Sequence, residues 1–333
     1  MAPAADFGAL MERALEARRK LLERTDLELL RVFHGETEGM PGVFVERLGV
    51  AATLIVHEGV ADEGLNAQDL AEAALRALAP RGVRGVYHKP FLRHRPGLKG
   101  AAPAVLSDAL PLAGESVPEA IHAREHERRF EIRPYDGFST GLFLDQRETR
   151  DMLARWVRAR RGGRVLNTFA YTCGFSVATA LGGARTTSVD VSGRYLDWGK
   201  RNFALNGLDA GAHAFARMDT FEYLAYAERK GLSFDLIVLD PPTFSTGDAR
   251  RGRKAWSAAR DYPALLAAAC ERLARGGAIF ASTNATELCR PGALRGMIRR
   301  GLGKEPRWLD TPGEPADFPG PSGRSHWAMF EPV

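Results

Sequence analysis

The sequence predicts an α/β protein, in which an open parallel sheet with helices on both faces follows a smaller α+β domain. From Arg164 onward, short apolar segments of strand-forming type alternate with helical periods, which is the pattern of a parallel sheet with crossover helices. Between Arg31 and about Leu112 the segments are shorter and are interrupted by a Gly-Met-Pro-Gly turn at 39–42. A chain of 333 residues with 45% hydrophobic content can fill two cores.

We expect three parts: an N-terminal helix in 1–30, a small α+β domain in 31–125 that contacts the substrate, and a larger domain in 126–333. The first helix repeats apolar residues on one face, so it either packs on its own domain or mediates a homodimer. In the small domain the pattern predicts strands at 31–35, 43–47, 52–57 and 85–89 and a helix at 64–78, ended by Pro80.

A β-hairpin is predicted at 118–135, and a helix from Asp145 to about Arg160 that the following glycines end. In the larger domain the expected strands are 164–167, 186–190, 213–218, 234–240, 278–282 and 326–330, and the expected helices are about 174–181, 192–206, 219–229 and 259–274.

Two segments carry concentrated positive charge. Residues 81–107 contain no acid, and their bases (Arg81, Arg84, Lys89, Arg93, Arg95, Lys99) are interleaved with Tyr87 and Phe91. A basic loop with aromatic surfaces suits a polyanion with exposed bases, although a solvated connection would look the same. The second segment, 248–260, holds Arg250, Arg251, Arg253, Lys254 and Arg260. It is a candidate lid or an ordinary surface loop.

The stretch F-D-L-I-V-L-D-P-P-T-F at 234–244 is the centre of the expected site. Its apolar run predicts a buried strand, which must end at Asp240 because Pro241 and Pro242 cannot continue a ladder. Ligands of open α/β sheets bind beyond the carboxyl ends of the strands. We therefore expect Asp240 and the carbonyls around the prolines to be fixed acceptors beside the flat surface of Phe244.

Three acids follow successive strands: Asp190, Asp219 and Asp240. Asp190 stands about twenty residues after the first strand of this half, where nucleotide-binding folds place the acid that accepts from ribose hydroxyls. Asp219, followed by Thr220, can accept from an adenine amino group or cap a helix. The loop at 167–176 lacks G-x-G-x-x-G, which disfavours a dinucleotide. A nucleoside with a charged tail, such as S-adenosylmethionine, needs less room.

These residues resemble a known family. The runs T-G-L-F-L-D-Q-R at 140–147, V-L-N-T-F-A-Y-T-C-G-F at 165–175 and D-P-P-T-F-S at 240–245 are similar to class I methyltransferases of bacterial 23S ribosomal RNA, the RlmI/RlmK group. The resemblance covers nearly all of 126–330 and implies a Rossmann-like methyltransferase domain. It differs from the RlmI pattern in lacking an N-terminal PUA-type domain. It implies that S-adenosylmethionine is lined by Asn167, Phe169, Tyr171, Thr172, Gly174, Asp190, Asp219, Thr220 and Asp240, with Thr140, Phe143 and Asp145 next to it.

The target atom follows from the cysteines. Methylating cytosine carbon 5 needs a thiolate nucleophile, and in that branch of the family the cysteine follows the fifth strand, where this chain has Asn284. The D-P-P-T-F-S form resembles the branch that methylates guanine N7, which carries a lone pair and needs only positioning. We expect Asp240 and the Pro241 carbonyl to hold the guanine edge, Phe244 to stack on the base, and Asn284 to support the pocket.

Four alternatives remain open at this point: cytosine carbon 5, a small-molecule or protein acceptor, a nucleotide-dependent oxidoreductase, and a non-catalytic RNA-binding protein. The three cysteines have no C-x-x-C spacing, so we expect a reducing compartment and no metal. No apolar segment is long enough to span a bilayer, and we expect a cytoplasmic protein.

Overall fold

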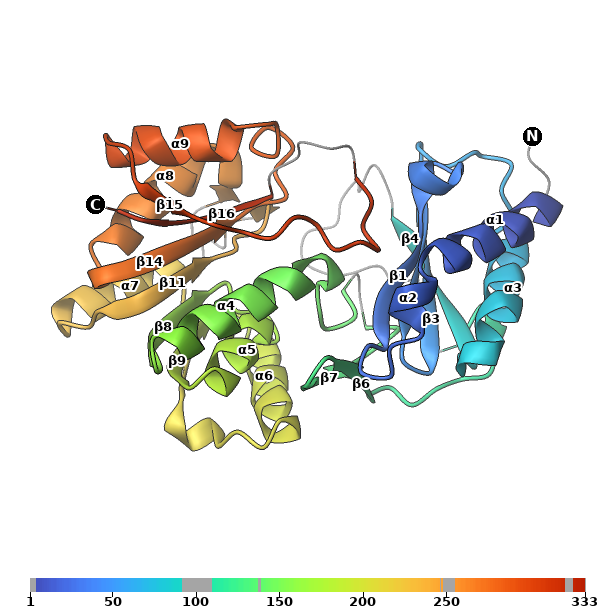
Figure 1. The fold of residues 1–333 in the computed structure, drawn as a ribbon, viewed down its shortest axis with the longest axis horizontal. Coiled ribbons are helices and arrows are strands. Elements are labelled where there is room, and N and C mark those ends of the chain that lie inside the picture. Colours follow the sequence, from blue (N-terminus) through green and yellow to red (C-terminus); the bar gives the residue numbers. More distant parts are fainter. Residues whose placement is uncertain are drawn as a thin grey trace. The chain divides into compact units, whose positions relative to one another are not determined.

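The computed structural model describes residues 4–91, 110–136, 139–245, 247, 255–320 and 326–332. Their contacts form two compact units (Figure 1). Unit 1 comprises Met1–Arg147 and Glu314–Gly320, and unit 2 comprises Glu148–Gly313 and Pro321–Val333. The chain therefore passes between the units after Arg147 and again on each side of 314–320. The division into a substrate-binding domain at 31–125 and a larger domain at 126–333 stays a prediction.

Unit 1 is a five-stranded sheet in the order β1-β2-β3-β4-β5, in which only β3 and β4 run parallel. Two helices cover one face, because the alternate residues Val43 and Val45 and the apolar stripes of the helices bury each other. The elements are α1 (Ala4–Ala17), α2 (Arg19–Leu22), β1 (Leu29–His34), η1 (Gly35–Glu38), β2 (Val43–Leu48), β3 (Ala51–His57), α3 (Ala67–Leu78), η2 (Ala79–Arg81), β4 (Gly85–Phe91), β5 (Ala113–Gly114), the hairpin β6 (Ile121–Glu125) and β7 (Arg128–Ile132), and η4 (Leu144–Gln146).

The N-terminal helix is shorter than predicted, because Leu29 already pairs with β2. Its apolar residues Phe7, Met11 and Leu15 are at most 1% exposed and lie in the core of unit 1 with α3. Of the two roles considered for this face, packing on its own domain is the one the structure contains.

Unit 2 is a seven-stranded sheet in the order β10-β9-β8-β11-β14-β16-β15. The first five strands are parallel, as predicted, whereas β16 runs antiparallel to both of its neighbours, β14 and β15. The elements are α4 (Arg147–Ala159), β8 (Gly163–Thr168), α5 (Gly174–Leu181), β9 (Ala184–Asp190), α6 (Gly193–Leu205), η5 (Ala210–Ala212), β10 (Ala214–Arg217), α7 (Thr220–Arg229), β11 (Phe234–Leu239), β12 (Phe244–Ser245), β13 (Trp256–Ser257), α8 (Ala258–Cys270), β14 (Leu273–Ser282), α9 (Ala293–Leu302), β15 (Arg307–Leu309) and β16 (Trp327–Glu331).

Both faces of this sheet are buried, which explains why its central strand is a continuous apolar run. Along β11, Ile237 and Leu239 pack with α7, α8 and α9 in one cluster, while Leu236 and Val238 pack with α4 and Phe175 of α5 in another. The alternation of side chains along a strand produces this division. Helix α9 and the strands β12, β13 and β15 were not predicted.

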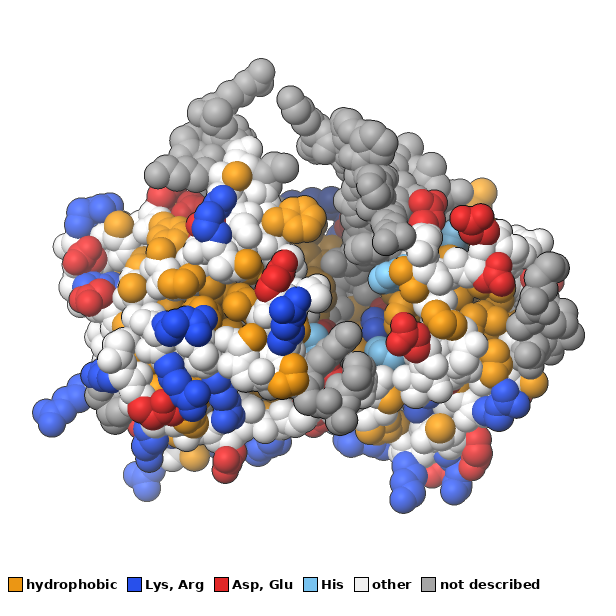
Figure 2. All heavy atoms as spheres, turned by 90° about the horizontal axis from the view of Figure 1, so that it is seen from above, with side chains coloured by type: hydrophobic (Ala, Val, Ile, Leu, Met, Phe, Trp, Pro, Cys, Tyr) orange, Lys and Arg blue, Asp and Glu red, His pale blue; other side chains and the backbone are white. Residues whose placement is uncertain are grey.

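The predicted basic loop at 81–107 is wrong in its first part. Lys89 and Tyr87 belong to β4 and are 4% and 1% exposed, because the strand pairs with β3 in the middle of the sheet. Residues 92–107, and residues 250, 251, 253 and 254 of the second basic segment, lie outside the described part of the chain. On the face drawn in Figure 2, Lys and Arg side chains of the described residues are scattered among acidic ones.

Candidate active site

The strand order of unit 2 creates a switch point beside β8. The chain runs from β8 to β9 and β10 on one side and then returns to β11 on the other. The connections that leave the carboxyl ends of β8 and β11 therefore diverge, and this is the usual position of a ligand crevice in open α/β sheets. Thr168, Asp190 and Leu239 are the last residues of β8, β9 and β11.

The loop after β8 is held in an unusual conformation. Phe169, Tyr171 and Cys173 have φ angles of 53°, 48° and 65°, in the left-handed region that side chains other than glycine rarely adopt. Such conformations cost about 1–3 kcal/mol each and concentrate at ligand sites. The Tyr171 N–H donates to Oδ2 of Asp190 at 2.9 Å, so the acid on the next strand fastens this loop.

Asp190 has a second backbone donor, because the Ser192 N–H lies 2.8 Å from its Oδ1. Burial raises the pKa of Asp190, and these two hydrogen bonds oppose the rise. A carboxylate has about four lone-pair positions, so one N–H on each oxygen leaves both able to accept from a further donor. The arrangement suits two neighbouring hydroxyl groups, such as those of a ribose.

Two residues predicted to line the cofactor have internal partners. Asn167 is 1% exposed and its Nδ2 donates to the Ser176 hydroxyl at 2.9 Å, tying β8 to α5. Thr172 is also 1% exposed, and its carbonyl accepts from Asn202 Nδ2 at 2.9 Å. These contacts shape the loop that ends at Gly174, the first residue of α5.

Asp219 caps α7, one of the two roles considered for it. Its Oδ1 accepts the Phe221 N–H at 2.8 Å, and Thr220, the first helical residue, is buried. Apolar side chains stand exposed directly after Asp190 and Thr220: Val191 is 41% and Phe221 is 37% exposed. Neither was predicted, although Val191 directly follows Asp190 and Phe221 lies two residues after Asp219, and both of these acids were predicted.

The D-P-P turn is fixed by residues of β14 and α8. The Ser282 hydroxyl donates to Oδ1 of Asp240 at 2.5 Å. The Tyr262 hydroxyl lies 2.9 Å from the carbonyl oxygens of both Leu239 and Ser282, so it joins the carboxyl ends of the two strands. Ser282 therefore orients the Asp240 carboxylate, and Tyr262 holds the strand end that precedes it.

Trp256 forms a second attachment of this turn. Its Nε1–H donates to the Pro242 carbonyl at 2.7 Å, so this carbonyl already has a donor within the protein. The carbonyl that we expect to hold a base is a different one, that of the buried Pro241. The Trp256 ring lies 5.8 Å from that of Phe169 and 6.2 Å from that of Phe221, between centroids. Aromatic side chains of the loop after β8, of α7 and of β13 thus lie close to one another.

Phe244 is 75% exposed and forms the short strand β12, paired with β13. Asn284 is exposed in the connection after β14. Phe143 (45% exposed), Thr140 and Asp145 belong to unit 1, where the Thr140 carbonyl accepts the Arg133 N–H at 2.8 Å. Their place beside the cofactor stays a prediction.

Sequence reasoning missed Ser282, Tyr262 and Trp256. Ser282 ends the strand predicted at 278–282, as Asp240 ends the strand predicted at 234–240, so a contact between these two strand ends could have been considered. No local signal marks Tyr262 or Trp256, because their partners are backbone carbonyls 14 to 23 residues away.

Two of the three cysteines, Cys173 and Cys270, are poorly suited to nucleophilic chemistry. Burial raises the pKa of Cys173 to about 12 and that of Cys270 to about 11. Cys289 is buried, and its Sγ lies 3.4 Å from both the Thr283 carbonyl oxygen and Nδ1 of His326. Among the described residues, no three His, Cys, Asp or Glu side chains gather as metal ligands, and no helix is long and apolar enough to cross a membrane.

Comparison with known proteins places this geometry in context. A family model described as S-adenosylmethionine-dependent methyltransferase matches residues 105–304. YwbD of Bacillus subtilis, provisionally named a ribosomal RNA large subunit methyltransferase, is 36% identical over 84% of this chain and 67% of its own length. Ribosomal RNA large subunit methyltransferase I of Klebsiella pneumoniae is 33% identical over 82% and 64%. Methyltransferase K of Neisseria meningitidis is 42% identical over 48% and 44%.

A solved structure of similar fold is also that of a methyltransferase. SMU.776, a provisionally named methyltransferase in complex with S-adenosylhomocysteine, has a TM-score of 0.82 and 27% identity, covering 99% of this chain and 81% of its own. The chain spans less than two thirds of the length of several curated relatives, such as the Klebsiella and Neisseria proteins.

Proposed function

This chain belongs to the S-adenosylmethionine-dependent methyltransferases, and we propose that it methylates a base of RNA, namely guanine N7 of large-subunit ribosomal RNA. The observation that carries the choice of base is the D-P-P turn: the Asp240 carboxylate, held by Ser282, precedes the exposed ring of Phe244 by four residues, in a chain whose Cys173 and Cys270 thiols stay protonated at neutral pH.

The residues at the strand ends fit the cofactor. Asp190 accepts from the ribose hydroxyls, with Tyr171 and Ser192 fixing its orientation. Val191 and Phe221 supply apolar surfaces for the adenine, and the loop from Asn167 to Gly174 contacts the charged tail. S-adenosylmethionine, when bound, supplies an electrophilic methyl group on a sulfonium.

The protein's task is to present the target base. The Asp240 carboxylate accepts from the N1–H and N2–H of guanine, and the Pro241 carbonyl adds a fixed acceptor. Phe244 stacks on the exposed base, a contact worth about 1–3 kcal/mol, and Asn284 supports the pocket. N7 has a lone pair and no proton, so alignment suffices and no general base is required.

A cytosine-5 mechanism requires a thiolate in contact with the base. The pKa of Cys173 is raised to about 12 and that of Cys270 to about 11, so both thiols remain protonated at neutral pH. This disfavours a covalent adduct through either of these two cysteines and supports a positioning mechanism. RNA as the substrate class is supported by the names of the relatives and by the charge of +5, and a base within a duplex must be extruded to reach the site.

The test is nucleoside mass spectrometry of ribosomal RNA from cells with and without the gene, followed by restoration with purified protein and labelled S-adenosylmethionine. We expect 7-methylguanosine to be lost and restored. Loss of 5-methylcytidine would replace guanine by cytosine. Unchanged nucleosides, with S-adenosylmethionine still bound, would redirect the search to protein or small-molecule acceptors.

Asp240→Asn tests the grip on the base. The amide cannot accept both guanine donors, so methylation should fall by about a hundredfold, at about 1.36 kcal/mol per factor of ten. Asp209→Asn, which alters an exposed cap of η5, is the matched control. Full activity and cofactor binding in Asp240→Asn would show that the assignment is wrong.

A further inference from the structure

Unit 2 contains a groove away from the candidate active site, which we call the β10 groove. It has a volume of about 950 Å³ and lies over β9 and the edge strand β10, beside α7. Its floor consists of small side chains, namely Thr187 of β9 and Ala214 and Ala216 of β10. These point to one face, since Ala214 pairs with Thr187 and alternate residues share a face. Longer side chains at these three positions would fill the groove, whereas Thr and Ala leave it open.

Two tyrosines of α7 form a wall. The rings of Tyr223 and Tyr226 lie 5.8 Å apart, centroid to centroid. Burial raises the pKa of Tyr223, whose hydroxyl is hydrogen-bonded to Thr187. Tyr226 is partly exposed. Tyr223 is 5% exposed, so the surface and the hydroxyl group that the wall offers to a ligand are mainly those of Tyr226.

Two arginines lie at the mouth. Arg164 and Arg185 are exposed lining residues near the amino ends of β8 and β9 and are direct neighbours in the sheet. Neither guanidinium has an ion pair with any described residue, and that of Arg164 lies 5.4 Å from the centroid of the Phe234 ring. The Asp235 carboxylate accepts the backbone N–H of Arg164 at 2.7 Å. Like charges opposite each other are unfavourable, and a bound anion would offset this repulsion.

We propose that the β10 groove binds an unpaired nucleotide of the RNA, with its phosphate on Arg164 and Arg185 and its base on the tyrosine wall. Arginine pairs bind phosphate and aromatic rings stack on bases, and the volume is within the range of ligand sites. This rests on RNA being the substrate. Arg164 precedes Phe169 by five residues, roughly 16 Å along a strand, so the groove contacts RNA beyond the target base.

The test measures binding of a fluorescent single-stranded RNA of about 12 nucleotides by anisotropy at several salt concentrations. Removing both arginines (Arg164→Ala with Arg185→Ala) should weaken binding by about tenfold or more and lower the salt slope by about two. Ala214→Trp, at an exposed floor position, fills the groove without changing charge and should also weaken binding. Arg229→Ala removes an exposed charge of α7 outside the groove and is the matched control.

The outcomes separate this site from the proposed function. If the arginine and tryptophan variants bind RNA like Arg229→Ala while ribosomal RNA is still methylated, the groove assignment is wrong and the function stands. If RNA binding depends on the groove but no nucleoside is methylated, the groove stands and the function fails. Adenosine monophosphate binding as tightly as the oligonucleotide, with dependence on Arg185, would make this a free-nucleotide pocket and overturn the RNA assignment.

Discussion

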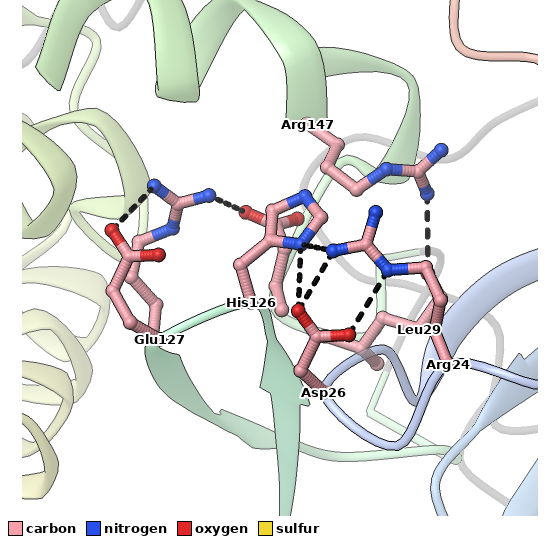
Figure 3. A network of polar contacts seen from close by, with 8 residues as sticks. Arg24, Asp26, Leu29, His126, Glu127 and Arg147 are labelled. Carbon is pink, nitrogen blue, oxygen red and sulfur yellow. Dashed lines mark hydrogen bonds and ion pairs between the residues drawn. The ribbon is translucent and has the colours of Figure 1, made fainter. Parts of the chain in front are cut away.

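Arg147 and Asp317, 170 residues apart in the chain, form an ion pair in which both side chains are at most 1% exposed. Nη1 of Arg147 also lies 3.2 Å from Oδ2 of Asp317, and the same guanidinium approaches the Leu29 carbonyl, as drawn in Figure 3. Oδ2 of Asp317 accepts the Arg31 N–H at 3.0 Å. The segment 314–320 is thereby fixed to β1 within unit 1.

Asp317→Asn should destabilise unit 1 by about 3–5 kcal/mol, because it removes a buried counter-charge of the Arg147 cation. The free energy of unfolding in urea measures this. Glu23→Gln removes one partner of the exposed pair with Arg19 and should cost at most about 1 kcal/mol. Equal effects of the two substitutions would contradict the importance of burial here.

Gly199→Ala should destabilise the chain by about 1–3 kcal/mol through overpacking. A Cβ at Gly199 would lie 2.3 Å from Sγ of Cys173, a side chain inside the loop after β8. Cys173 has a φ of 65°, which glycine adopts without strain. The double variant Gly199→Ala/Cys173→Gly should therefore recover much of the loss, as thermal unfolding would show. No recovery would mean that the clash lies elsewhere.

Stability should fall as the pH drops from about 6.5 to about 4. Burial lowers the pKa of His34 to about 4, with Arg31 and Arg18 adding repulsion and Asp317 opposing it. The ring packs between Phe44 and Phe318. In this range the unfolded chain binds a proton at His34 that the folded chain does not, so unfolding is favoured as the pH falls.

His34→Gln should flatten this pH dependence, measured as the urea midpoint at several pH values. His57, whose pKa burial also lowers, retains part of the slope. His122→Gln, at an exposed position of β6, is the control and should leave the slope unchanged. An unaltered slope in His34→Gln would exclude His34 as its source.

Phe244→Ala should raise the KM for RNA by about fivefold to a hundredfold, since a stacked base contributes about 1–3 kcal/mol, and should leave S-adenosylmethionine affinity unchanged. Phe244 is 75% exposed, so folding should be unaffected. Val60→Ala, at another exposed apolar position, provides the comparison. Methylation kinetics and calorimetry of cofactor binding distinguish the two effects, and a loss of cofactor affinity would move Phe244 into the cofactor site.

The elements of unit 2 could be predicted because their signals are local. The helix expected at 174–181 matches α5, and the acid-and-proline end of 234–240 marks the end of β11, since proline cannot donate to a ladder. The three acids after successive strands were also predictable. Helix α9 was missed despite the helical spacing of Leu294, Met297 and Ile298.

The sequence by itself determined the alternation of strands and helices, the acids at the strand ends and the absence of a glycine fingerprint, because each depends on neighbouring residues. Tertiary structure alone decided that Lys89 is buried, that Trp256 holds Pro242, that Ser282 orients Asp240 and that Asp317 meets Arg147. These depend on strand order and on contacts between distant segments. Burial and register arise only when the whole sheet has formed, and a shift of one residue would reverse the face of every side chain.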